Sequence, residues 1–300
     1  MKFIKLLYSL FIKFLQRKAL RELLINPKNR KTSKLLYLFG IKHVTQSVAR
    51  EGDVLVNNLN GGLFICDRSD VIQSYLIKHR TFSPHIIDII QSFIRPESYF
   101  IDVGAHCGAI SIPIAVNNPQ SKVIAIEPQV ELIERLNINK KINHLKNLSI
   151  ESIGLYSKTT ELEVSLPKRN DGKVISELVG KLDKKYSGIR SIEKIPVCTL
   201  DSLISTKEPG LISVIKIDVQ GNELEVLKGA KQTLKKHRPY LIIEIEDKLS
   251  TNPETNRFEL KKILEKNNYQ LFLLDKNLPR KYPMADLDLP MENDFLAIPM

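Results

Sequence analysis

The chain has 300 residues, of which 43% are hydrophobic and 26% are charged. These values are ordinary for a globular protein and exclude a disordered or collagen-like chain. The length predicts one large domain, or one domain with an appendage, that buries its own core. No uncharged apolar run reaches the roughly 18 residues of a transmembrane helix, which disfavours a membrane-spanning protein.

The charge is distributed unevenly along the chain. The formal net charge is +11, and residues 1–50 contain twelve Lys and Arg residues but one acid, Glu22. Residues 51–300 hold equal numbers of basic and acidic residues, so the body is neutral and nucleic-acid binding is disfavoured. The three cysteines lack a CxxC spacing, which indicates a reducing, cytoplasmic compartment rather than a disulfide framework.

The N-terminal segment is a basic amphipathic pattern. Apolar residues share one face of a helical wheel, and Lys5 and Lys13 lie on the other. Residues 1–24 are therefore interpreted as a peripheral membrane anchor, as an accessory helix packed on the body, or as a nucleic-acid-binding arm. We predict a helical arm and linker over 1–50 and a domain over 51–300. Within that domain, residues 51–95 form a hairpin and helices, and 96–300 form the catalytic core.

The body alternates between apolar strand patterns and helical periodicity. A hairpin turning at Asn60-Gly61 comes first, and Asn222 with Glu225 predicts a capping box on a later helix. The predicted helices are 69–80, 84–94, 110–118, 129–141 (opened by Pro128), 222–236 and 258–268. The predicted strands are 99–104, 122–128, 213–221, 240–246, 269–275 and 293–299, the last two pairing antiparallel. Such alternation predicts a mostly parallel sheet covered by helices on both faces.

Three acids mark the predicted ligand edge of this sheet. Asp102, Glu127 and Asp218 each end a strand, and such sheets bind ligands at the carboxyl ends of their strands. The first turn, Asp102 to Gly108, has a G-x-x-x-G spacing rather than the G-x-G-x-x-G of a pyrophosphate cradle. Glu127 can accept two hydrogen bonds from a ribose diol and would repel a 2′-phosphate. These features predict a site for an unphosphorylated adenosine group.

The ordered series DVGAHCG, IEP and KIDVQGNE resembles class I S-adenosylmethionine-dependent methyltransferases and, more narrowly, the FkbM methyltransferase family. The resemblance extends from about residue 80 to 300. It implies a Rossmann-like α/β fold: a seven-stranded, mostly parallel sheet with an antiparallel last strand and helices on both faces. It also implies methyl transfer from S-adenosylmethionine, mostly to oxygen, with hydroxyls or carboxyls of natural products, sugars and glycolipids as acceptors.

The resemblance also implies roles for individual residues. The cofactor-binding residues would be Asp102, Gly104, Ala105, His106, Gly108, Glu127, Pro128 and Asp218. Two positions depart from the family pattern: His106 replaces the usual Asn, and Gln220 replaces the usual Glu. His106 is read either as a structural histidine or as a residue that stacks on the cofactor or shuttles a proton.

The candidate catalytic residues are Asp218, Lys216 and Glu223. Lys216 and Asp218 are two apart on one strand and point to the same side, which suits a site pair or a structural ion pair. Glu223 begins the next helix, where it contacts an acceptor or favours the helix dipole. Asp218, Glu223 and Glu244 could gather oxygen ligands, but their spacing demands no metal, and none is predicted.

The predicted function is O-methylation of a hydroxyl on a glycan, glycolipid or secondary metabolite. The alternatives are an RNA ribose methyltransferase and a non-catalytic cofactor-binding module. A nicotinamide oxidoreductase is disfavoured by the glycine spacing. The segments 167–194 and 277–290 are read either as acceptor lids or as surface excursions.

Overall fold

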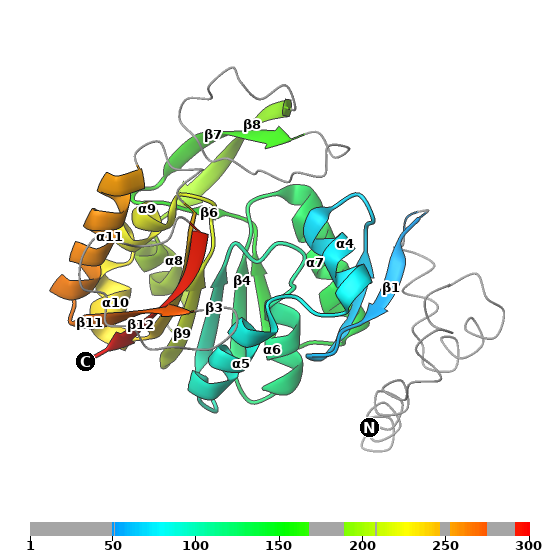
Figure 1. Cartoon of the computed structure of the whole chain (residues 1–300), viewed down its shortest axis with the longest axis horizontal. Helices are drawn as coiled ribbons and strands as arrows, with labels where there is room; N and C mark the ends of the chain where they lie inside the picture. Colours follow the sequence, from blue (N-terminus) through cyan, green and yellow to red (C-terminus); the bar gives the residue numbers. More distant parts are fainter. Residues whose placement is uncertain (1–49, 51, 168–188, 208, 247–252, 275–291) are drawn as a thin grey trace.

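The computed structural model describes residues 50, 52–167, 189–207, 209–246, 253–274 and 292–300 (Figure 1). The predicted arm over 1–50 lies outside these residues except for Arg50, and so do most of 167–194 and the whole of 277–290. The division into an arm and a domain and the lid interpretations therefore stay predictions. In the part of the chain that is described, no helix is both long and apolar enough to cross a membrane.

A seven-stranded sheet forms the centre of the fold, with the strand order β11-β12-β10-β9-β3-β4-β5. Its strands are β3 (Tyr99–Val103), β4 (Lys122–Ile126), β5 (Leu148–Glu151), β9 (Ile212–Ile217), β10 (Tyr240–Glu246), β11 (Tyr269–Leu274) and β12 (Glu292–Pro299). Strand β12 runs antiparallel to both neighbours, whereas β10, β9, β3, β4 and β5 pair in parallel. This arrangement confirms the predicted Rossmann-like fold class, including its antiparallel last strand.

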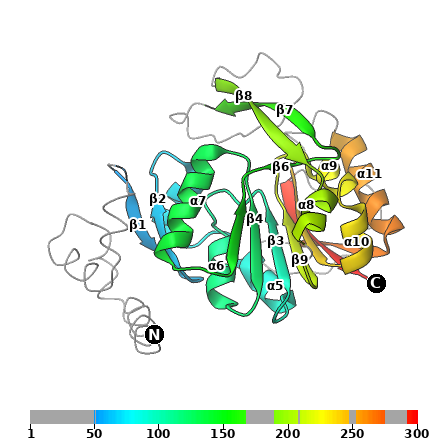
Figure 2. The ribbon, with the colours of Figure 1, turned by 180° about the vertical axis from the view of Figure 1, so that it is seen from behind.

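Helices cover both faces of the sheet. One face carries α4 (Val71–His79), α5 (Pro84–Phe93), α6 (Ser111–Asn117) and α7 (Val130–Ile142), with α5 and α6 in front in Figure 1. The other carries α8 (Leu200–Lys207), α9 (Glu223–Lys228), α10 (Lys231–His237) and α11 (Pro253–Lys266), as Figure 2 shows. Neighbouring strand residues such as Phe100 and Ile101 belong to opposite core clusters, because side chains alternate across a strand. This double burial explains the continuous apolar runs in the sequence.

Two smaller sheets flank the central one. The predicted hairpin is present as β1 (Val54–Asn57) paired antiparallel with β2 (Leu63–Cys66), and its connecting loop includes Asn60 and Gly61. The second small sheet has the order β6-β8-β7. Its strands are β6 (Gly154–Leu155), β7 (Thr160–Pro167) and β8 (Ile189–Cys198).

Buried polar contacts fix the hairpin to α7 and to the turn after β3. Asn139 on α7 is fully buried, accepts a hydrogen bond from the Ile65 N–H at 2.8 Å and donates to the Cys107 carbonyl at 3.0 Å. Arg135, one turn earlier, donates to both carboxylate oxygens of Asp53 at 2.8 and 2.9 Å. These bonds tie residues that precede the first central strand to the turn that follows it.

The predicted helix over 222–236 is wrong, because the chain forms α9 and α10 with a break at Gly229. A Cβ atom at Gly229 would lie 2.3 Å from the Tyr156 carbonyl oxygen, so the chain turns where it meets the end of β6. The capping box is also wrong, since the Asn222 side chain makes no cap hydrogen bond. The Glu225 carboxylate bonds Ser157 and Lys228 instead.

The start of α7 differs slightly from prediction. The helix begins at Val130 with Gln129 as its N-cap, so Pro128 precedes the helix rather than opening it. Pro128 is consequently free to line the ligand edge of the sheet.

Candidate active site

A cavity opens at the carboxyl ends of β3, β4 and β9. It is lined by Ile72, Gly104, His106, Glu127, Pro128, Gln129, Ile195, Asp218, Val219 and Gln220. The cavity is shallow, and the space in it and in front of it amounts to about 570 Å³ with the open mouth included. Five residues predicted to bind the cofactor thus line one cavity, although they come from three strand ends that are far apart in sequence.

The glycine turn after β3 brings backbone segments together. Gly104 has φ +82°, and a Cβ atom there would lie 1.8 Å from the Asp218 carbonyl oxygen. Gly108 has φ +88°, and its Cβ would lie 2.5 Å from Leu136. Gly104 therefore allows two strand ends to approach at the cavity, whereas Gly108 serves helix packing behind it. Ala105 is buried in the core and does not line the cavity.

Glu127 presents a fixed carboxylate at the end of β4. It accepts hydrogen bonds from the backbone N–H of His106 at 2.9 Å and from that of Gln129 at 3.1 Å. The residue is only 4% exposed, and burial raises the pKa of its carboxyl group. Because a carboxylate offers about four lone-pair positions, Glu127 can still accept bonds from a ligand in the cavity.

His106 adopts a left-handed backbone conformation, with φ +52°, and its side chain meets Asp70. The imidazole Nε2 lies 3.2 Å from Asp70 Oδ2. Burial would lower the pKa of His106, but the contacts with Asp70 and Cys107 together outweigh it and raise the pKa well above its usual value. Asp70 is not among the site residues predicted from the sequence, but its contact with His106 links it to the site. The sequence feature that could have identified Asp70 is its position as the N-cap of α4.

The Lys216 ammonium lies between the carboxylates of Asp102, in the core, and Asp218, at the cavity. Its Nζ atom lies 2.7 Å from Asp218 Oδ2 and 4.0 Å from Asp102 Oδ1. Burial would lower the pKa of Lys216, but the nearby carboxylates of Asp218 and Asp102 raise it. Asp102 is 1% exposed, bonds Ser111, and does not line the cavity, and burial raises the pKa of its carboxyl group. Asp102 therefore lies beneath the site, one contact away from Asp218.

Glu223 faces the backbone of the turn after β9 rather than the cavity. Its carboxylate accepts hydrogen bonds from the N–H groups of Val219 at 3.2 Å and Gly221 at 3.0 Å. Burial raises the pKa of Glu223 to about 7. Its observed contacts hold the turn that carries Asp218, and the structure brings it to no position in the cavity lining.

A second row of acidic groups lies beside Asp218. Glu244 on β10 is the register partner of Asp294 on β12, and His85 Nε2 lies 3.4 Å from Asp294 Oδ2. The neighbouring charge of Asp218 and burial raise the pKa of Glu244 to about 9. His85 and Asp294 lie in no recognisable motif, so the sequence alone does not predict their place beside Glu244.

No group of three or more His, Cys, Asp or Glu side chains in the described ranges is arranged to hold a metal ion.

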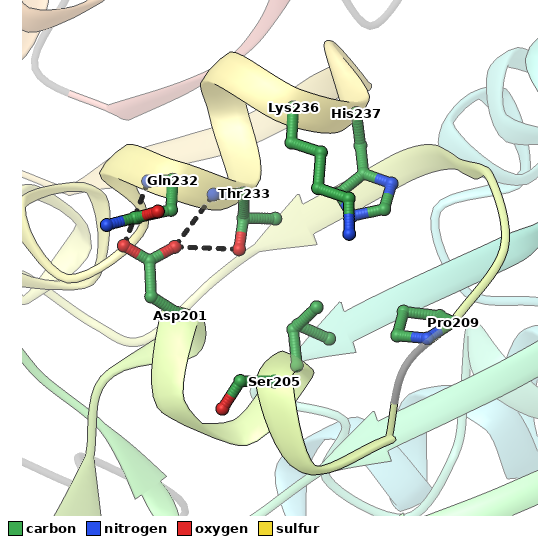
Figure 3. Close-up of a pocket in the computed structure, with 8 residues that line it drawn as sticks. Asp201, Ser205, Pro209, Gln232, Thr233, Lys236 and His237 are labelled. Carbon is green, nitrogen blue, oxygen red and sulfur yellow. Dashed lines mark hydrogen bonds between the residues drawn. The ribbon is translucent and has the colours of Figure 1, made fainter.

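A larger pocket, of about 1250 Å³ with its mouth, lies between α8 and α10 (Figure 3). Its carboxylate, Asp201, is turned toward the start of α10, where it accepts hydrogen bonds from the N–H groups of Gln232 at 2.9 Å and Thr233 at 2.8 Å. Lys236 and His237 line the other end of the pocket. None of the predicted site residues lines it, so the smaller cavity at the strand ends is the candidate active site.

The family model described as the Methyltransferase FkbM domain matches residues 102–271, more than half of the chain. The chain belongs to the FkbM methyltransferase family. The resemblance inferred from the sequence motifs is therefore confirmed, and S-adenosylmethionine is the methyl donor of that family. The matched range includes Asp102, Glu127 and Asp218 but begins after Asp70.

Individual relatives share parts of the chain. Methyltransferase sdnD of Sordaria araneosa is 26% identical over 185 residues, which cover 54% of this chain and 70% of sdnD. Ribosomal RNA small subunit methyltransferase G of Helicobacter pylori (strain HPAG1) is 32% identical over 85 residues, or 28% of this chain. The chain spans only about half, 48%, of that relative.

Solved structures give more distant likenesses. The methyltransferase FkbM from Methylobacillus flagellatus KT is 16% identical, with a TM-score of 0.42, and the match covers 76% of this chain and 52% of that one. TYW2 of M. jannaschii, solved in complex with AdoMet, is 15% identical with a TM-score of 0.43. That match covers 83% of this chain and 85% of TYW2.

Proposed function

We propose that this protein transfers a methyl group from S-adenosylmethionine to a hydroxyl oxygen of a glycan, glycolipid or secondary metabolite. The observation that carries the proposal is the pair of carboxylates, Glu127 and Asp218, that line one cavity on either side of Gly104. Membership of the FkbM family supports the reaction class. The choice of oxygen and of the acceptor class rests on the family resemblance.

The cavity suits the cofactor chemically. S-adenosylmethionine supplies an electrophilic methyl group on a positively charged sulfonium. Glu127, fixed by two backbone N–H groups, would accept hydrogen bonds from the ribose hydroxyls. The absence of a Cβ at Gly104 leaves the backbone of the turn open to the ligand. Asp218 would face the cationic end, where a carboxylate is electrostatically favourable.

The chain's own contribution to the transfer is positioning and proton removal. As the acceptor oxygen bonds to the methyl carbon, the carbon–sulfur bond breaks and the hydroxyl proton must leave. We assign that proton to Asp218, an acidic residue that lines the cavity. Lys216, at 2.7 Å, keeps this carboxylate oriented, and Glu223 holds the turn that bears it. We therefore assign Asp218 as the base and Lys216 and Glu223 as positioning residues.

An RNA ribose methyltransferase is the second candidate, because the Helicobacter relatives act on ribosomal RNA by name. The carboxylates of Asp218 and Asp294 beside the cavity disfavour it, because they would repel RNA phosphates. A non-catalytic module that binds the cofactor is the third, motivated by His106 and Gln220 at positions where the family has other residues.

A membrane-associated acceptor is a further part of the proposal. It rests on the amphipathic pattern of residues 1–24, which lie outside the described ranges. Deletion of residues 1–34 is expected to release the protein from anionic liposomes in a flotation assay. Unchanged flotation would contradict the anchor and leave the methyltransferase proposal intact.

Calorimetric titration of S-adenosylmethionine and S-adenosylhomocysteine tests the cofactor. We expect micromolar binding to the wild type and a loss of roughly 100-fold in Glu127→Ala, since two charge-assisted hydrogen bonds disappear. Glu134→Gln, an exposed carboxylate on α7, is the matched control and should bind normally. If the wild type binds, labelled donor with sugars, lipid-linked glycans and RNA then separates the three candidates. Failure of a folded wild type to bind either compound would exclude the proposed function.

A further inference from the structure

The ion pair between His106 and Asp70 connects the cavity turn to helix α4. The two charged atoms, Nε2 and Oδ2, lie 3.2 Å apart, and each side chain is 12% exposed. Solvent screens so buried a pair only weakly, so removing one partner leaves the other as an uncompensated buried charge. Asp70 is the N-cap of α4 and His106 lies in the turn after β3, so the pair links these two elements.

His106 acts on the cavity from two directions. Its side chain binds Asp70, while its backbone N–H donates to Glu127 Oε2 at 2.9 Å. Its φ of +52° is a conformation that histidine adopts at a cost, so contacts must maintain it. The contact with Asp70 supplies such a constraint, and the direction of the N–H toward Glu127 depends on it.

Asp70 controls the start of α4. It is the N-cap, and its Oδ1 accepts the Gln73 N–H at 2.8 Å. Ile72, in the first turn of this helix, lines the cavity. Because Asp70 fixes the start of α4, it also fixes the position of Ile72 in the cavity lining. Asp70 precedes the segment 102–271 matched by the family model, so this connection is not part of the matched core.

We propose that His106 and Asp70 are positioning residues that set cofactor affinity: their ion pair aims the His106 N–H at Glu127 and holds Ile72 against the cavity. The inference rests on the proposed function, since the ligand is the S-adenosylmethionine proposed above. Neither residue takes part in proton removal from the acceptor.

The pair predicts a pH dependence of binding. The charged or titratable groups around the imidazole are Asp70 from α4, Glu127 from the end of β4 and the neighbouring Cys107. Against the lowering effect of burial, the contacts with Asp70 and Cys107 raise the pKa of His106, so the pair is fully formed below the usual histidine pKa and is lost as pH rises through the raised value. Cofactor affinity should fall over that same rise.

Two substitutions remove the charges and preserve the backbone. Asp70→Asn keeps a good N-cap residue on α4. His106→Asn introduces a residue that tolerates the left-handed conformation. Each variant and the double variant are titrated with S-adenosylmethionine by calorimetry, with Glu134→Gln as the control. The His106 ring is followed by NMR in wild type and Asp70→Asn from the usual histidine pKa upward in pH.

We expect each single variant to bind about tenfold more weakly and the double variant to be no worse than either single, the signature of one shared interaction. Asp70→Asn should also lower the His106 pKa. Additive losses, unchanged affinity, or an unchanged His106 pKa would overturn the inference. If Asp70→Asn does not fold, His106→Asn and the wild-type pH titration of binding decide it. A wild type that binds no cofactor contradicts the proposed function itself, whereas equal affinity in wild type and variants contradicts only the role of the pair.

Discussion

Asp102 and Lys216 are register partners on the parallel strands β3 and β9, and both point to the sheet face covered by α5 and α6. The Lys216 ammonium lies 4.0 Å from Asp102 and 2.7 Å from Asp218. A buried cation thus stands between a carboxylate of the core and a carboxylate of the cavity. This arrangement couples the stability of the sheet to the charge state of the proposed base.

Lys216→Met is expected to destabilise the protein by about 3–5 kcal/mol, because it leaves two carboxylates without their buried partner. Urea unfolding measures the free energy. Lys207→Met removes a more exposed pair with Glu151 and should cost less than about 1 kcal/mol. Equal losses in the two variants would contradict a special role for Lys216.

Asp218→Asn tests the proposed base. With an acceptor identified by screening, kcat is expected to fall about 10²- to 10⁴-fold, the usual contribution of a general base. The dissociation constant for S-adenosylhomocysteine should change far less, since Glu127 and the glycine turn remain. A variant that retains full kcat would rule out Asp218 as the base.

The buried Glu223 predicts a pH dependence of stability. Burial raises its pKa from 4.5 to about 7, so the folded state holds the proton more tightly than the unfolded state. Stability should therefore decline as pH rises from about 4.5 to about 7, by about 3 kcal/mol. Glu223→Gln has no such proton to lose and should show a shallower decline. Identical profiles from urea unfolding of the two proteins would be evidence against this environment.

Gly108→Ala tests the packing role of the turn. The substitution forces a Cβ toward Leu136 at a φ of +88° and should cost about 1–3 kcal/mol. Gly210→Ala is the matched control, since a Cβ there meets no atom within 4 Å. The control is expected to stay within about 0.5 kcal/mol of wild type in thermal unfolding. A silent Gly108→Ala would show that the turn tolerates a side chain.

The sequence by itself determined the fold class and much of the candidate site, through hydrophobic periodicity and the acidic residues at strand ends. Apolar runs such as Tyr99–Val103 and Ile212–Ile217 are local signals of strands buried on both faces, and the order of elements dictates a parallel sheet. Because parallel strands end at one edge of the sheet, the sequence alone also predicts that Glu127 and Asp218 lie close together, and both line the cavity. The motif series indicated the family on the same local basis.

Only the tertiary structure decided which side chains meet across elements. The break at Gly229 follows from contact with Tyr156, the burial of Asp102 from Ser111 and Lys216, and the partner of His106 from the docking of α4. None of these contacts can be predicted from hydrophobic periodicity or from a sequence motif. They depend on how helices pack against the sheet, and that packing is set by the summed burial of many residues rather than by any local pattern.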